Sequence, residues 1–192
     1  LRIVSILFFA LLIVSHLSAG LIHDGSFENN PSAWEEYFIT SGCTVSGIGN
    51  WSNVNGAPAN FDGNQSFWAG GSCNNAVSNN GARQTITLGP NAAVLSFWYV
   101  PVKNFVDPSG QDKARVRINN NTVWELAVNG PTGQPTWKNA LINISQYAGQ
   151  EITLALEMNQ NIVITANVFF DFIEIYNPAV QISQQVTPPN VL

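Results

Sequence analysis

The residues of this chain that could carry covalent chemistry are a few carboxylates and one histidine beyond residue 20, His23. A glycoside hydrolase needs two carboxylates about 5–9.5 Å apart across a cleft. Glu125, Glu151, Glu157 and Glu174 offer such carboxylates, but outward-facing glutamates on a sheet are usually only solvated. The sequence contains no G-x-S-x-G, H-E-x-x-H or phosphate-binding glycine motif. It therefore favours a protein without catalytic activity, with glycoside hydrolysis as an alternative.

Aromatic side chains offer a second, non-covalent chemistry. In residues 93–100, alternation places Leu95, Phe97 and Tyr99 toward a core and leaves Ser96 and Trp98 on the outer face. Flat rings that stack on the C–H faces of sugars, beside polar groups that bind hydroxyls, make a glycan site. We therefore predict Ser96 and Trp98 as ligand contacts.

The last apolar segment, residues 163–176, continues this argument. Its outer parity belongs to Phe170, Phe172, Glu174 and Tyr176. Arg115 and Arg117 project outward from another predicted strand and are expected to serve the same face. The predicted ligand-binding set is Trp98, Ser96, Arg115, Arg117, Phe172 and Glu174. For the other tryptophans, the alternative is that they pack beneath loops; these are Trp34, Trp51, Trp68 and Trp137.

Asp171 is the most informative charged residue. It shares parity with Phe169, Ile173 and Ile175, so its side chain is expected to point toward the core or its rim. An unpaired buried carboxylate is costly and is either neutralised or given a partner. Hydrogen bonds from loop amides are one candidate partner.

The elements that must position these residues are strands. Alternation with period two predicts strands over residues 84–88, 93–102, 115–118, 123–128, 151–158 and 163–176. Three consecutive asparagines at 119–121 predict a hairpin turn, because Asn tolerates left-handed backbone angles. Residues 40–60 and 70–82 are rich in Gly, Asn and Ser and are expected to be loops. The pattern predicts an all-β, two-sheet antiparallel sandwich.

Length and charge limit the class of protein. A chain of 192 residues is enough for one domain, expected over residues 21–177. Residues 178–192 form a polar tail, expected to be a linker or disordered. Removing Arg2 with the N-terminus takes the net charge from −5 to −6 (−5 − 1). Such a chain cannot neutralise a phosphate backbone, so nucleic acid is not an expected partner.

The N-terminus predicts export. Residues 3–14 are apolar except for Ser5, and Ser18, Ala19 and Gly20 supply small residues for cleavage. A run this short is typical of a signal peptide over residues 1–20, and an uncleaved N-terminal anchor is the alternative. No second apolar stretch follows, so no membrane span is expected in the mature form. The protein is therefore expected to be secreted and extracellular.

Cys43 and Cys73 are the only cysteines. In an exported protein, two cysteines most simply form a disulfide, and two ligands are too few for a zinc site. The bridge would close a loop of about thirty residues, worth roughly 3–4 kcal/mol in the chain-entropy account.

Six motifs in chain order resemble the jelly-roll, galactose-binding-like modules that include many carbohydrate-binding modules and bacterial surface proteins. The motifs are LIHDGSFE at 21–28 followed by Trp34, FDGN at 61–64 leading into FWAGG at 67–71, QTITL at 84–88, LSFWY at 95–99, Trp137 before INISQYAGQ at 142–150, and FFDFIEI at 169–175. Together they span most of residues 21–176. They are more specific for the fold than for the ligand, because this fold hosts many functions.

The resemblance also implies a structural calcium ion. Its ligands would be Glu28 of the opening motif, Asp171 of the closing strand and backbone carbonyls near Asp24, since calcium takes six to eight oxygens. The family often has a second acid after the closing aspartate, where this chain has Phe172.

The combined expectation is a secreted, non-catalytic binding module whose partner is a polysaccharide or other glycan. The alternative is a structural or adhesive cell-surface protein that acts through contacts with other surface proteins.

Overall fold

The computed structural model describes residues 22–29, 32–38, 47–54, 56–71, 78–103, 111–128, 133–160 and 166–177. The predicted signal peptide, Cys43, Cys73 and the predicted tail after residue 177 lie outside the described residues.

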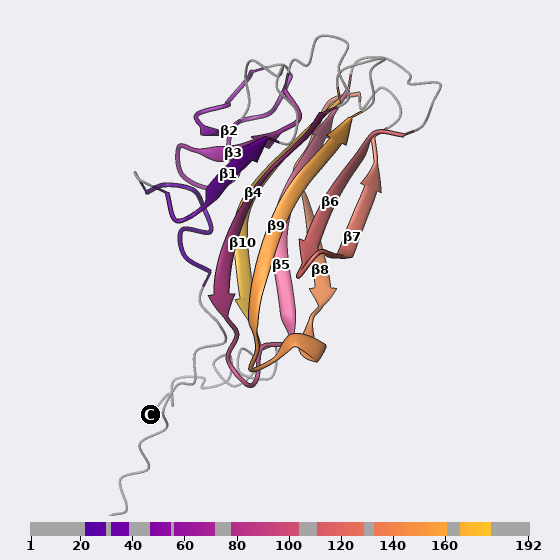
Figure 1. Ribbon diagram of the computed structural model, residues 1–192. Coiled ribbons are helices and arrows are strands. Elements are labelled where there is room, and N and C mark those ends of the chain that lie inside the picture. Colours follow the sequence, from indigo (N-terminus) through magenta and orange to yellow (C-terminus); the bar gives the residue numbers. More distant parts are fainter. Residues whose placement is uncertain are drawn as a thin grey trace, which may run out of the picture.

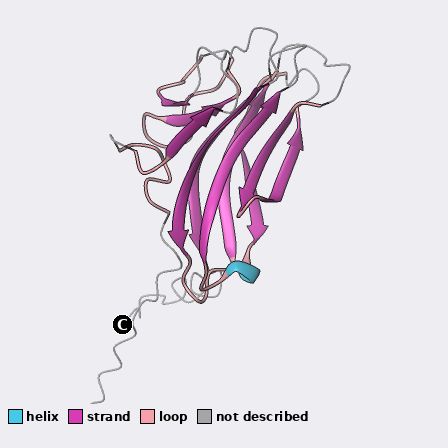
Figure 2. Ribbon diagram, in the orientation of Figure 1, coloured by secondary structure: helices cyan, strands magenta, loops and turns pink. Residues whose placement is uncertain are grey.

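Strands dominate the described part of the chain, with one short 3-10 helix, η1 (Figure 2). The elements are β1 (Glu35–Phe38), β2 (Gly47–Gly49), β3 (Ser66–Ala69), β4 (Ser78–Thr87), β5 (Val94–Val102), β6 (Lys113–Ile118), β7 (Asn121–Ala127), β8 (Lys138–Asn143), η1 (Ser145–Tyr147), β9 (Glu151–Gln160) and β10 (Asn167–Tyr176). The predicted all-β class is confirmed.

The strands form two five-stranded antiparallel sheets that face each other (Figure 1). Sheet A has the order β1-β4-β9-β6-β7, and sheet B has the order β2-β3-β10-β5-β8. Alternation explains sheet A: in β9, Ile152, Leu154, Leu156 and Met158 are all buried in the core, as predicted. The predicted two-sheet sandwich is therefore confirmed.

The main core lies between the sheets and contains side chains from both. Phe97 of β5 and Phe170 of β10 lie 5.9 Å apart between ring centroids, and Trp124 of sheet A packs edge-on against Phe97 at 5.2 Å. Burial of these rings removes large apolar areas from water and is the main force that holds the two sheets together.

The predicted hairpin turn joins β6 to β7. Asn119 and Asn120 have φ values of 49° and 67°, which is the left-handed pair that a tight two-residue hairpin requires. The side-chain oxygen of Asn119 also accepts a 2.8 Å hydrogen bond from the N–H of Thr153 in β9. Asparagine at these positions therefore explains the turn.

Two predicted loops contain strand residues. β2 falls within residues 40–60, and β4 begins at Ser78 within residues 70–82. β2 has only three residues and pairs with β3 alone, so its alternation is too short to recognise in a sequence.

The predicted parity of β10 is wrong in its first half. Phe170, predicted to face outward, lies in the main core, whereas Phe169 packs with Trp68 and Val100 in a second cluster. The pairing of β10 with β5 shifts between Asp171 and Glu174, which marks a β-bulge. Because the bulge adds one unpaired residue, it reverses which parity faces the core.

Candidate functional site

The outer face of sheet B is built from two rows of residues that are in register across β10, β5 and β8. The first row is Asp171, Trp98 and Asn139, and the second is Glu174, Ser96 and Leu141. Residues in register on neighbouring strands point to the same side of a sheet. Since Leu95 and Phe97 of β5 lie in the core, these rows face away from it.

Asp171 is fully buried beneath the segment that contains Phe61. Its Oδ2 accepts hydrogen bonds from the N–H groups of Phe61 at 2.9 Å and Asp62 at 3.0 Å, and its Oδ1 accepts one from Phe172 at 2.7 Å. Burial raises the pKa of Asp171 to about 7, although the three N–H donors act in the opposite direction. Asp171 thus fixes the Phe61 segment to the outer face, not to the core side that parity predicted.

Phe61 covers one face of the Trp98 ring. The two rings are stacked, with centroids 3.9 Å apart and planes 16° apart. Trp137 and Phe172 complete the group, at 6.1 Å and 5.9 Å from Phe61. We call these four residues the Trp98 cluster. Phe61 is 38% exposed, and the other three are partly buried, so the cluster reaches solvent.

Phe172 owes its place to the bulge. Its φ is 49°, a conformation that an aromatic residue adopts only where surrounding contacts impose it. The hydrogen bond from its N–H to Asp171 and the shifted pairing impose it here. As predicted, Phe172 lies on the outer side.

The indole N–H distinguishes Trp98 from the tryptophans for which packing beneath loops was the alternative. Each of those four donates its indole hydrogen to the protein: Trp34 to Asp24 O, Trp51 to Gly47 O, Trp68 to Asn167 Oδ1 and Trp137 to Ala59 O. Within the part of the chain that the structure describes, the indole N–H of Trp98 has no acceptor. It remains available to a ligand.

Polar groups border the aromatic rings. Asn139 Nδ2 donates to Ser96 Oγ at 3.0 Å and to the carbonyl of Phe97 at 3.3 Å. Ser96 itself is buried, so it holds Asn139 in place and has little contact with solvent. Glu174 as a whole is exposed to solvent, but its carboxyl group is partly desolvated, and this raises the pKa of the carboxyl group.

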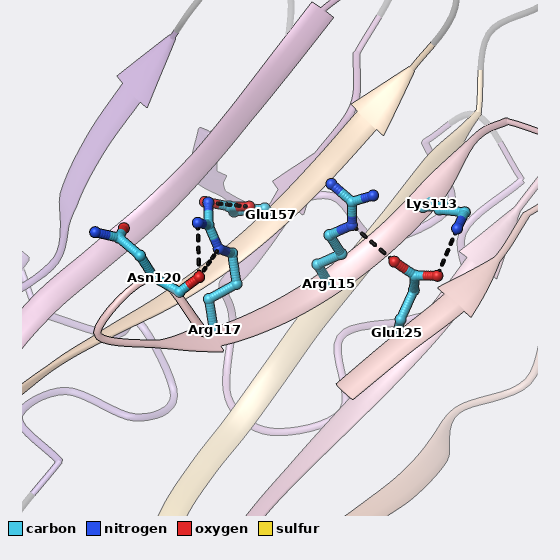
Figure 3. Close-up of polar contacts among 6 residues, drawn as sticks. All are labelled: Lys113, Arg115, Arg117, Asn120, Glu125 and Glu157. Atoms are coloured by element: carbon cyan, nitrogen blue, oxygen red, sulfur yellow. Dashed lines mark hydrogen bonds and ion pairs between the residues drawn. The ribbon is translucent and has the colours of Figure 1, made fainter. Parts of the chain in front are cut away.

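Arg115 and Arg117 do not join this face, contrary to the prediction. Both belong to β6 of sheet A, whereas Trp98, Ser96, Phe172 and Glu174 belong to sheet B. They do project outward, where Arg115 Nε bonds Glu125 at 2.9 Å and Arg117 Nη1 bonds Glu157 at 3.2 Å (Figure 3). Alternation gives the face that a residue occupies, but not the sheet to which its strand belongs.

The glutamates weighed for hydrolysis are divided between the two sheets. Glu125, Glu151 and Glu157 belong to sheet A, and Glu174 belongs to sheet B. Glu157 is buried between Arg117 and the hydroxyl of Tyr37, which donates to it at 2.6 Å. Glu125 and Glu157 are therefore engaged in polar contacts within sheet A, which gives both a structural role.

The residues predicted to bind calcium have protein partners. Glu28 Oε1 accepts hydrogen bonds from the N–H groups of Asn64 at 2.8 Å and Gln65 at 2.7 Å, and Asp171 accepts three from its own segment and the Phe61 segment. The carbonyl of Asp24 accepts the indole N–H of Trp34. Among the described residues, no three His, Cys, Asp or Glu side chains form a metal-binding group. In this arrangement the side chains do not form a calcium ligand set, and calcium binding stays a prediction.

Four residues of this site were absent from the predicted set. Phe61 and Trp137 occur in the motifs that carry the family resemblance, yet nothing in the sequence places either beside Trp98. Asn139 and Leu141 lie in β8, whose alternation was not recognised. Leu141 is 61% exposed, the most exposed large apolar side chain in the described part of the chain.

Within the residues that the structure describes, no helix has the length and hydropathy needed to cross a bilayer.

Comparisons with known proteins identify the fold. No protein-family model matches the chain, and no curated protein matches it in sequence. Among solved structures, the K2 cleaved adhesin domain of Lys-gingipain aligns with a TM-score of 0.55 at 15% identity, covering 82% of this chain and 98% of that one. The K1 domain from Porphyromonas gingivalis W83 gives 0.52 at 18% identity, with 79% and 95% covered.

A carbohydrate-binding module is also similar. TmCBM61, solved in complex with β-1,4-galactotriose, aligns with a TM-score of 0.50 at 14% identity, covering 80% of this chain and 91% of the module. Likeness at such identity is evidence of fold and not of ligand. The chain shares the β-sandwich fold of these structures, as expected from its resemblance to galactose-binding-like modules.

Proposed function

We propose that this chain is a secreted, non-catalytic module that binds carbohydrate on the outer face of sheet B. The observation that carries the proposal is the Trp98 cluster: a solvent-reaching group of rings around Phe61 in which the indole N–H of Trp98 lacks a protein acceptor among the described residues. An indole N–H that lacks a protein acceptor and is not buried can donate to a ligand hydroxyl.

The chemistry of this surface suits a sugar. Phe61 and Phe172 offer apolar ring surface to the C–H faces of a pyranose, while Trp98 offers a donor and Glu174 an acceptor to its hydroxyls. Strands β5 and β10 position Trp98 and Phe172, and hydrogen bonds hold the Phe61 segment and Trp137 beside them before any ligand arrives. Such preorganisation lowers the entropy cost of binding. The fold likeness to a carbohydrate-binding module supports the same proposal.

Affinity electrophoresis in gels that contain neutral polysaccharides tests the proposal. We expect the protein of residues 21–192 to be retarded by at least one of them, and Trp98→Ala to abolish the retardation. Trp98→Phe keeps a six-membered ring beneath Phe61 and removes the N–H together with the smaller ring of the indole. We expect it to weaken affinity roughly five- to tenfold, since one hydrogen bond contributes about 1 kcal/mol.

The control for both variants is the melting temperature, which shows whether they remain folded. If a folded Trp98→Ala variant were retarded as strongly as the wild type, the binding site would not lie at Trp98 on sheet B. Absence of retardation by every polysaccharide would contradict carbohydrate binding itself.

Secretion is part of the proposal and rests on the predicted signal peptide. Expression of the chain in an exporting cell should release a protein whose mass corresponds to a start near residue 21. A cell-associated product that keeps residues 1–20 would favour the uncleaved anchor.

The second candidate function is structural or adhesive, through contacts with proteins. Leu141 favours it, because an aliphatic side chain that is 61% exposed gains more from a protein surface than from a sugar. Matrix assembly through this face would appear as concentration-dependent association in sedimentation, and Leu141→Asp would abolish it. A monomer at all concentrations would count against assembly between copies.

A further inference from the structure

The Lys and Arg residues that the structure describes can each be assigned a position relative to the Trp98 cluster. The sequence has seven Lys and Arg residues. Four lie on sheet A: Arg83, Lys113, Arg115 and Arg117. Each of these four is paired with a carboxylate of the same sheet. They therefore lie across the core from the proposed glycan site.

Of the remaining three, the structure describes two, and neither offers a cation to this face. Lys103 is buried in an ion pair with Asp112. Lys138 of β8 is in register with Tyr99, whose ring packs against the core, so it does not share the face of Trp98. Arg2 belongs to the predicted signal peptide, outside the described residues. Within the described part of the chain, the outer face of sheet B thus contains no cation.

The same face contains an unpaired anion. Within the described residues, the Glu174 carboxylate makes no ion pair and accepts no hydrogen bond. It belongs to the row with Ser96 and Leu141, next to the row that contains Trp98. Partial burial raises its pKa, as expected for a carboxylate without a counter-charge.

Asn139, a neutral polar residue of the same face, also offers a hydrogen-bond acceptor. Both hydrogen bonds that Asn139 Nδ2 donates go to the protein, to Ser96 Oγ and to the carbonyl of Phe97. What Asn139 can offer a ligand is therefore its Oδ1. Asp171 and Ser96 are buried, so the polar side chains of these two rows that a ligand can reach are Trp98, Asn139 and Glu174. Of these, Trp98 offers a donor, whereas Asn139 Oδ1 and the Glu174 carboxylate offer acceptors.

We infer that Glu174 sets the charge of the ligand: the site binds uncharged glycans through their hydroxyl donors and discriminates against glycans that carry carboxylate or sulfate groups. The inference rests on the proposed function, because it assigns a ligand class to the same site. Hydroxyl groups of a neutral sugar can donate to Glu174 and to Asn139. An acidic sugar brings acceptors where the protein already has acceptors, and a second negative charge beside an unpaired one.

Like-charge repulsion at contact distance in partly desolvated surroundings is large enough to measure. At low salt it should weaken binding of an acidic sugar on the order of tenfold, and the effect should shrink as ionic strength rises. Glu174→Gln removes the negative charge and keeps the shape and one acceptor. It should therefore strengthen binding of the acidic sugar and weaken binding of the neutral sugar, which exchanges a charged acceptor for a neutral one, so that the preference between the two forms narrows.

The test uses matched polysaccharides: β-1,4-galactan, a cellulose derivative and an α-glucan, each before and after oxidation of its C6 hydroxyls to carboxylates. Retardation of the wild type, Glu174→Gln and Glu151→Gln is compared at low and at physiological salt. Glu151 is an exposed glutamate of sheet A, so its variant changes the net charge equally at a distance from the site.

We expect the wild type and Glu151→Gln to prefer the neutral form of whichever polysaccharide binds, and Glu174→Gln to lose most of that preference. Equal binding of both forms by the wild type, or a preference that Glu174→Gln leaves unchanged, would overturn the inference while carbohydrate binding stood. No retardation by any polymer, neutral or oxidised, would overturn the proposed function and the inference with it.

Discussion

At the scale of single residues, Asp171 links the fold to the site. Its carboxylate accepts three backbone N–H groups, two of them from the segment that places Phe61 over Trp98. The sequence identified Asp171 as informative, and it predicted loop amides as one candidate partner. It did not predict the side of the sheet, because the bulge that turns Asp171 outward is invisible in the alternation of residues 163–176.

Asp171 gives a pH dependence with a definite sign. Burial raises its pKa from the unfolded value near 3.8 to about 7, so the folded state holds this proton more tightly than the unfolded state. The contribution to stability is fully present below about pH 4 and is lost as the pH rises through about 7. We expect the melting temperature, measured with chelator present, to fall between pH 5 and pH 8.

The control is Asp171→Asn, which cannot titrate and should flatten this part of the profile. Glu174 titrates in the same direction, because burial raises its pKa as well, and Glu174→Gln separates the two contributions. A wild-type melting temperature that rises steadily from pH 5 to pH 8 would contradict the account of Asp171.

At the scale of elements, the sequence predicted strands better than it predicted their neighbours. Alternation in β9 and β5 gave the correct buried faces, because each strand has one face in a single core. It did not show that Arg115 and Trp98 belong to different sheets, because the pairing of strands depends on contacts between residues that are distant in sequence. It also missed β1, β2, β3 and β8, each of which has six residues or fewer.

The turn between β6 and β7 provides a test at this scale. Asn120 has φ of 67°, where a β-branched side chain clashes with the backbone. Asn120→Val should lower the free energy of unfolding by about 1–2 kcal/mol. Asn120→Gly should leave it unchanged or raise it slightly, because glycine adopts this conformation without strain. Urea denaturation of both variants measures the difference, and equal destabilisation would contradict the turn assignment.

At the scale of the whole molecule, the two sheets have different surfaces. Sheet A presents a row of paired charges, in which Lys113 and Arg115 share Glu125 and Arg117 meets Glu157 (Figure 3). Sheet B presents rings, amides and one unpaired carboxylate. The sequence contained all these side chains, but only the arrangement of the strands shows that the surface ion pairs lie on sheet A and the Trp98 cluster on sheet B.

The calcium prediction also belongs to this scale, because a bound ion would stabilise the whole fold. If calcium binds only the native state, excess chelator must lower the melting temperature and added calcium must restore it. An unchanged melting temperature when calcium is returned to metal-free protein would contradict the prediction. The N–H partners of Glu28 and Asp171 would then explain the positions of both carboxylates without a metal ion.

The most direct test of the central claim is to follow the six indole N–H signals by NMR while neutral trisaccharides, beginning with β-1,4-galactotriose, are added to ¹⁵N-labelled protein. Ligand binding at the outer face of sheet B predicts a large, saturable shift of the Trp98 signal, while the signals of Trp34, Trp51 and Trp68 stay in place. Saturable binding that leaves the Trp98 signal unmoved, or shifts confined to residues of sheet A, would contradict it.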